Sequence, residues 1–109
     1  MYDLIRKTST VLPEDVIRAI KKAVAREEKG SVAKTTLEII LKSIALSSEK
    51  GLPICQDTGT VLVMIEGRPD ASIFHLEKSI KDAIRKLTRE GILRQNCVCP
   101  LTEKNTLDN

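Results

Sequence analysis

The sequence predicts a mainly helical α+β domain, and three observations support this prediction. Two stretches, 13–29 and 31–49, carry apolar residues at helical spacing. Residues 61–65, Val-Leu-Val-Met-Ile, form a short apolar run rich in β-branched residues, which favours a buried strand. A third helical pattern follows, and residues 92–109 show little periodicity. We therefore expect two N-terminal helices, a short buried strand, a third helix and an extended C-terminal tail.

The ends of the first two helices are marked by residues with known positional preferences. Pro13 suits the first turn of a helix, and Ser31 can cap the helix that follows it. Gly51 and Pro53 stop that second helix, because proline cannot continue the backbone hydrogen bonding. Since only a turn centred on Gly30 separates the two helices, we expect an antiparallel or angled pair.

The third predicted helix is capped by Asp70 and ends at Gly91. His75, the single histidine of the chain, lies within it. We interpret His75 as a surface or half-buried helix residue, because the sequence offers it no partner. The apolar stripe of this helix consists of Ile73, Leu76, Ile80, Ile84 and Leu87.

Composition narrows the classes of function. The chain has 109 residues, 30% of them charged, with a net charge of +3 and only 2% aromatic residues. Nucleic-acid binding is disfavoured, because the positive charge is weak and few rings are available for base stacking. No apolar run approaches the roughly 20 residues of a membrane span. We expect a cytoplasmic protein, in which three cysteines are free thiols or metal ligands.

The loop between the second helix and the predicted strand holds an unusual group of polar residues. Cys55 directly precedes Gln56 and Asp57, and Gly59 permits a positive φ or a close backbone approach. A thiolate at Cys55 is a soft ligand for iron or zinc, and Asp57 is a possible acid or base. The alternative is an ordinary turn with a small buried cysteine, and the spacing alone does not exclude it.

Two motifs in order resemble one enzyme family. The string Pro-Ile-Cys-Gln-Asp-Thr-Gly-Thr, residues 53–60, is similar to the signature of the class I iron–sulfur fumarases and the related L-tartrate dehydratase α subunits. Residues 91–96 and 100–106 resemble a second segment of that family, with the pattern LR-x-N followed by PLT-x-KNT. The resemblance covers most of the chain and implies the N-terminal part of a hydro-lyase α subunit, 1–109.

The resemblance also implies roles for individual residues. Cys55 would be one of three cysteines that hold a 4Fe-4S cluster, so its sulfur must not be sealed in aliphatic packing. Gln56 and Asp57 would contact the substrate, and Asp57 would position it or transfer a proton. Arg94 would bind a carboxylate of a small 2-hydroxy dicarboxylic acid, which suits its planar guanidinium. The reaction would be reversible trans elimination of water, with fumarate and tartrate both open. The residues implied to line or support the site are Lys104, Asn105 and Thr106.

The sequence departs from the family pattern in two places. Leu107 stands where the family usually has a glycine, and leucine resists a positive φ. The other cluster cysteines of the family would lie beyond Asn109, so we expect a piece of a larger protein that is inactive alone. Cys97 and Cys99 do not match the family's ligands. They are incidental thiols or, alternatively, ligands of a local zinc or cluster, with a spacing that signals neither strongly.

The expected partners follow from the missing ligands. They are the remaining part of the α subunit, a β subunit or both, in a homo- or hetero-oligomer, together with the dicarboxylate substrate. The competing hypothesis is a non-catalytic assembly domain that pairs with itself or with a partner subunit. We further expect residues 92–109 to be poorly packed in the chain alone.

Overall fold

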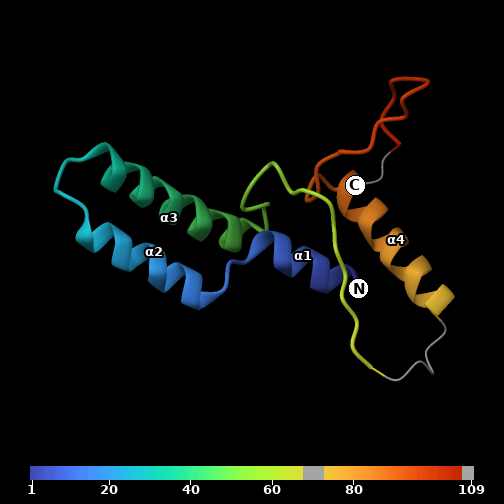
Figure 1. Ribbon diagram of the computed structural model, residues 1–109, viewed down its shortest axis with the longest axis horizontal. Coiled ribbons are helices and arrows are strands. Elements are labelled where there is room, and N and C mark those ends of the chain that lie inside the picture. Colours follow the sequence, from blue (N-terminus) through green and yellow to red (C-terminus); the bar gives the residue numbers. More distant parts are fainter. Residues whose placement is uncertain (68–72, 107–109) are drawn as a thin grey trace. The chain divides into compact units, whose positions relative to one another are not determined.

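Figure 1 shows the computed structural model, which describes residues 1–67 and 73–106. The chain divides into two compact units, one formed by residues 1–9 with 55–109 and the other by residues 10–54. The helices of the described residues are α1 (Tyr2–Thr10), α2 (Glu14–Arg26), α3 (Val32–Lys50) and α4 (Ile73–Arg89).

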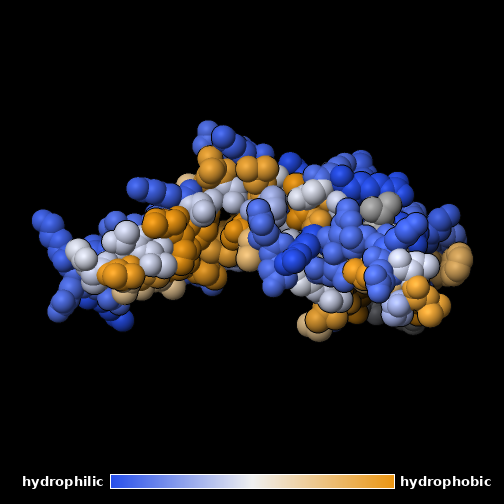
Figure 2. All heavy atoms as spheres, turned by 90° about the horizontal axis from the view of Figure 1, so that it is seen from above, coloured by the Kyte–Doolittle hydropathy of each residue, from blue (hydrophilic) through white to orange (hydrophobic). Residues whose placement is uncertain are grey.

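The unit of residues 10–54 is the helix pair that the sequence predicts. Helices α2 and α3 pack against each other and run antiparallel (Figure 1). The hydroxyl oxygen of Ser31 accepts a hydrogen bond of 3.1 Å from the backbone N–H of Lys34, which confirms the predicted cap. Ile44 is buried in this unit, and Ile17 and Leu41 are half-buried. Many of its other apolar side chains stay exposed and show at its surface in Figure 2.

The other unit has a small aliphatic core between α1, α4 and the residues that follow α4. The core cluster contains Leu87, which is 0% exposed. Helix α1 was not predicted, because its nine residues are too few for a clear apolar period. It forms where Ile5 packs into the cluster, so its stability depends on tertiary contacts. The buried members of the cluster are Ile5, Ala83, Leu87, Ile92 and Leu93.

Polar contacts at the edge of this core join α1 to the end of α4. The Tyr2 hydroxyl donates a hydrogen bond of 2.5 Å to the Glu90 carboxylate. The Lys86 ammonium lies 4.5 Å from the centroid of the Tyr2 ring, within range of a cation–π contact. The bond to Glu90 raises the pKa of Tyr2 above its ordinary value, because ionising the phenol would remove the donated proton.

Gly91 ends α4 and redirects the chain. Its φ of +73° lies in the left-handed region that glycine tolerates best. The N–H of Gly91 donates to the Thr88 carbonyl at 3.2 Å, and the N–H of Ile92 donates to the Leu87 carbonyl at 3.0 Å. These are the two bonds of a Schellman motif, and its apolar contact is made by Ile92 and Leu87, both in the core cluster. The motif anchors the start of the segment that leads to Arg94.

The predicted strand and the predicted α+β class are both wrong. Residues 61–65 do not form a buried strand: among the described residues the structure has no β-strand, only an isolated antiparallel bridge between Val98 and Asn105. Leu62 and Met64 are 89% and 94% exposed, and no second strand pairs with this segment in the described chain. A β-branched run becomes a strand only when backbone partners are available, and none is present in the described chain. The α+β class is therefore corrected to mainly helical.

The tail differs from the expectation of poor packing only at its start, since residues 94–106 are exposed apart from half-buried Cys99. Ile92 and Leu93 belong to the core, at 8% and 3% exposure. The predicted cap at Asp70 and the departure at Leu107 lie outside the described residues. His75 is exposed on α4, as predicted. None of the helices that the structure describes is long and apolar enough to cross a membrane.

Candidate functional site

The loop that holds Cys55, Gln56 and Asp57 is irregular, and all three side chains are exposed. The sulfur of Cys55 is a free thiol that is not sealed inside aliphatic packing. Gly59 has a φ of +62°, with no atom within 4 Å of the place that a Cβ would occupy. Backbone conformation, not space, therefore favours glycine at this turn.

The structure brings two of the predicted site residues together. A guanidinium nitrogen of Arg94 lies 3.8 Å from a carboxylate oxygen of Asp57. Both side chains are largely exposed, at 60% and 77%, so water screens the pair and it contributes little to stability. Both charged groups face solvent beside each other, which leaves them accessible to a small charged ligand.

Two hydrogen bonds join the two chain segments that carry the residues of this ion pair. The backbone N–H of Arg94 donates to the Thr58 hydroxyl at 2.9 Å. The side-chain amide of Asn96 donates to the Gly59 carbonyl at 3.0 Å. Because these bonds join segments far apart in the sequence, they define the relative position of the 57–59 loop and residues 94–96.

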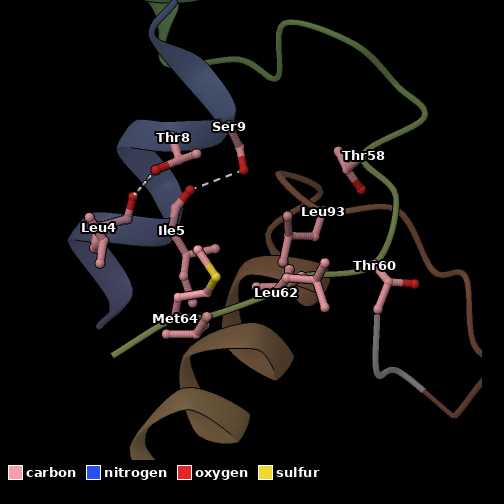
Figure 3. Close-up of a pocket in the computed structure, with 11 residues that line it drawn as sticks. Leu4, Ile5, Thr8, Ser9, Thr58, Thr60, Leu62, Met64 and Leu93 are labelled. Carbon is pink, nitrogen blue, oxygen red and sulfur yellow. Dashed lines mark hydrogen bonds between the residues drawn. The ribbon is translucent and has the colours of Figure 1, made fainter. Parts of the chain in front are cut away.

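A hollow of about 360 Å³ lies beside the loop (Figure 3). Helix α1 forms one wall, where Thr8 and Ser9 donate hydrogen bonds to the carbonyls of Leu4 and Ile5. The extended segment 58–64 and Leu93 supply the remaining lining. Cys55, Gln56 and Asp57 are not among the residues that line it. The hollow is mostly apolar, so it suits a side chain better than a dicarboxylate.

The predicted site residues Lys104, Asn105 and Thr106 lie in a hairpin with residues 97–99. The N–H of Cys99 donates to the Lys104 carbonyl at 3.0 Å, and the N–H of Thr106 donates to the Cys97 carbonyl at 3.1 Å. Glu103 takes a positive φ of 55° at the turn between the two arms. These backbone bonds therefore pair residues 104–106 with the cysteine segment rather than with the 55–57 loop.

The hairpin alters the chemistry of Cys99. The Thr102 hydroxyl donates to its sulfur, and the backbone N–H groups of Leu101 and Thr102 add further donors. These contacts lower the pKa of the Cys99 thiol, because they stabilise the thiolate more than the neutral form. Residues at i and i+2 of an extended segment lie on the same side, so Cys97 and Cys99 share one side of the hairpin.

A metal site is incomplete within the described residues. No group of three or more His, Cys, Asp or Glu side chains there is arranged to hold a metal ion. Cys55 has the right chemistry for one ligand of an iron–sulfur cluster, because it is a free, exposed thiol in a loop. Its exposure and chemistry therefore fit a role as one ligand among several.

The comparisons with known proteins show that the chain belongs to the fumarate hydratase family. The family profile described as "Fumarate hydratase (Fumerase)" matches residues 1–109. A protein of Geobacillus stearothermophilus, provisionally named fumarate hydratase class I, is 43% identical over 109 residues, which are 21% of its length. A protein of Methanocaldococcus jannaschii, provisionally named L(+)-tartrate dehydratase subunit alpha, is 34% identical over 112 residues, which are 39% of its length.

The chain therefore spans well under half the length of these relatives, although both matches cover all of it. Sequence reasoning identified the family and the Asp57 and Arg94 residues that the structure places together. It gave no role to Thr58 or Asn96, which hold the two segments in place. Both residues lie inside the motifs that carry the resemblance. Their place in those motifs is the feature of the sequence that could have pointed to a role for them.

Proposed function

We propose that the chain is part of a 4Fe-4S-dependent hydro-lyase that reversibly adds or removes water at a small dicarboxylic 2-hydroxy acid. The carrying observation is the exposed Asp57–Arg94 pair, at 3.8 Å, in a chain of the fumarate hydratase family. Fumarate and tartrate are both candidate substrates, since relatives with either name match the whole chain. A cytoplasmic location accords with this proposal.

Arg94 and its neighbours would bind the substrate. The guanidinium presents a planar fork of N–H donors, which matches the two oxygens of a carboxylate. Gln56 offers an amide to the same diacid, and its side chain is exposed next to Asp57. The residues proposed to support the site from the hairpin are Lys104, Asn105 and Thr106.

Asp57 would orient the substrate or hold a proton at its carboxylate. Trans elimination removes a proton from the carbon next to the one that carries the hydroxyl, and it needs an acceptor on the opposite face. The Asp57 carboxylate is exposed, lies beside the cation of Arg94 and stands two residues from Cys55. It is therefore a candidate acceptor at the carbon, with Arg94 fixing the neighbouring carboxylate.

Cys55 would supply one thiolate to the cluster, with the other ligands from further parts of the protein. The chemistry that the group supplies when bound is Lewis-acid polarisation of the hydroxyl that leaves. The remaining part of the α subunit, a β subunit or both would complete the site, in a homo- or hetero-oligomer. This accords with the length of the relatives, of which the matched stretch is 21% and 39%.

Anaerobic reconstitution with iron and sulfide tests the proposal. The full-length subunit with its partner should gain cluster absorbance and hydrate fumarate or dehydrate tartrate. Cys55→Ser should lose both, whereas Cys97→Ser should keep both. A wild-type protein with neither absorbance nor turnover would end the proposal, and loss of the cluster in Cys97→Ser alone would transfer the ligand role to the hairpin.

A second candidate, an assembly domain without chemistry, is favoured by one observation. Leu62 and Met64 are 89% and 94% exposed, and large apolar side chains left in water favour association. In this case the chain would pair with itself or with a partner subunit. Sedimentation of the chain alone and with the partner discriminates: a monomer without affinity for the partner speaks against this candidate.

A further inference from the structure

The Asp57–Arg94 pair needs other groups to hold its geometry. Exposed ion pairs at distances near 4 Å contribute little and are easily exchanged for water. Both side chains also have rotatable bonds, two in aspartate and more in arginine, so their own attraction does not fix the segments that carry them. The relative position of the two charges must therefore come from the backbones on either side.

Two hydrogen bonds join the two backbones directly after Asp57, at Thr58 and Gly59. Thr58 follows Asp57, and its hydroxyl accepts the N–H of Arg94 itself at 2.9 Å. One residue further along, the Gly59 carbonyl accepts the Asn96 amide at 3.0 Å. Each bond is within the distance range of a good N–H···O hydrogen bond. Together they form a two-point link, which restrains rotation as well as separation.

One side of this link is itself anchored. Leu93, the residue before Arg94, is 3% exposed in the core cluster, and the Schellman motif at Gly91 sets the direction of the chain that leads to it. The loop on the other side is irregular and exposed, apart from half-buried Thr58. The bonds from residues 94 and 96 therefore hold the loop against a segment that is itself anchored in the core.

We propose that Asn96, together with Thr58, is a positioning residue that holds Asp57 and Arg94 in the arrangement that receives a dicarboxylate. The inference rests on the proposed function, because it assumes that this pair faces the substrate. Asn96 acts through the Gly59 carbonyl and not on the substrate. Preorganised groups bind and react better because their ordering is complete before the ligand arrives.

The test compares substitutions that do not change the charge. They are made in the full-length subunit, which is reconstituted together with its partner. Asn96→Ala removes the amide donor, and Gln95→Ala makes the same type of truncation one residue away. Thr58→Val removes the hydroxyl at nearly constant shape, whereas Thr58→Ser keeps it. Calorimetric titration of succinate measures dicarboxylate binding without turnover, and kcat and KM for fumarate hydration are measured in parallel.

We expect Asn96→Ala and Thr58→Val each to raise the Kd of succinate about tenfold, and to lower kcat/KM by at least as much, because the pair is no longer prearranged. Cluster content and Tm should stay at the wild-type level, and Gln95→Ala and Thr58→Ser should behave as wild type. The double variant should lose less than the product of the single losses, because both bonds serve one arrangement.

The inference is overturned if Asn96→Ala binds succinate as wild type does, or if Gln95→Ala weakens it equally. A wild-type protein that fails to bind succinate also overturns it. If Asn96→Ala does not fold, the comparison of Thr58→Val with Thr58→Ser decides alone. A wild-type protein that binds succinate but turns over neither fumarate nor tartrate ends the proposed function, and the binding comparison still decides the role of Asn96.

Discussion

The two units of the chain differ in the contacts that stabilise each of them internally: one depends on contacts between neighbouring elements, the other on contacts between distant segments. In residues 10–54 the packing partners α2 and α3 are neighbours in sequence, joined by a turn at Gly30. In the other unit, Ile5 packs with Leu87, and Thr58 bonds to Arg94, so distant segments meet. All the predicted site residues belong to this second unit. Long-range contacts thus coincide with the candidate chemistry, whereas the helix pair holds none of it.

The largest expected effect is a loss of activity, and it tests whether the proposed chemistry is confined to the second unit. Asp57→Asn in the reconstituted full-length subunit should lower kcat for fumarate hydration by about a thousandfold, because an amide cannot deliver to the carbon the proton that the carboxyl group would hold. Asp15→Asn makes the same substitution on α2 and should leave kcat unchanged. Steady-state kinetics measure both. Equal losses would show that the helix pair takes part in the chemistry and would remove the contrast between the units.

The core of the second unit supplies the next largest effect. Leu87→Ala should lower the free energy of unfolding by about 3 kcal/mol, because it leaves a cavity at a fully buried position. Chemical denaturation measures this loss. Hydrogen exchange should show reduced protection of amides in α4 and little change in α3, since contacts in the helix pair are local. Equal loss of protection in both helices would show that the units unfold together.

The same contrast explains what the sequence could predict. The start of α2 and both ends of α3 follow from Pro13, Ser31 and Gly51, whose effects act within a turn or two of backbone. The predicted end of the first helix at 29 is wrong, because α2 ends at Arg26 and Glu27 is already extended. Helix α1 was missed because it depends on the contact of Ile5 with a residue far along the chain. The 61–65 run was misread because local β preference was not matched by a pairing partner in the described chain.

The candidate site divides in the same way. Cys55, Asp57 and Arg94 were identified by resemblance, which works residue by residue along the chain. The bonds of Asn96 to Gly59 and of Arg94 to Thr58 join separate loops, and no local pattern specifies such pairs. Sequence reasoning therefore found the groups proposed for the chemistry and missed the groups that hold them.

A smaller effect is expected at the cap of the helix pair. Ser31→Ala should lower the free energy of unfolding by about 1 kcal/mol, because the N–H of Lys34 loses its acceptor. Ser31→Asp keeps an acceptor at this position and should retain the stability. Thermal and chemical denaturation of the 109-residue chain measure both variants. Loss of stability in Ser31→Asp as well would mean that the hydroxyl matters for another reason than capping.

The smallest expected effect concerns the hairpin thiol, and it tests whether local polar contacts also act within the second unit. The pKa of Cys99 is lowered chiefly by the Thr102 hydroxyl, so more of this thiol is ionised at neutral pH. Thr102→Val should raise that pKa and slow alkylation of Cys99 by iodoacetamide about threefold at pH 7, because the thiolate is the nucleophile. The backbone donors of residues 101 and 102 remain, which keeps the effect modest.

Mass spectrometry of the alkylated chain follows each cysteine separately, so Cys55 and Cys97 serve as internal references. At about pH 10 the wild type and Thr102→Val should react at similar rates, since the thiol is ionised in both. Thr102→Ser keeps the donor and should match the wild type at either pH. A slowing that persists at high pH would point to altered access and not to ionisation, and the hydroxyl would then have no electrostatic role at Cys99.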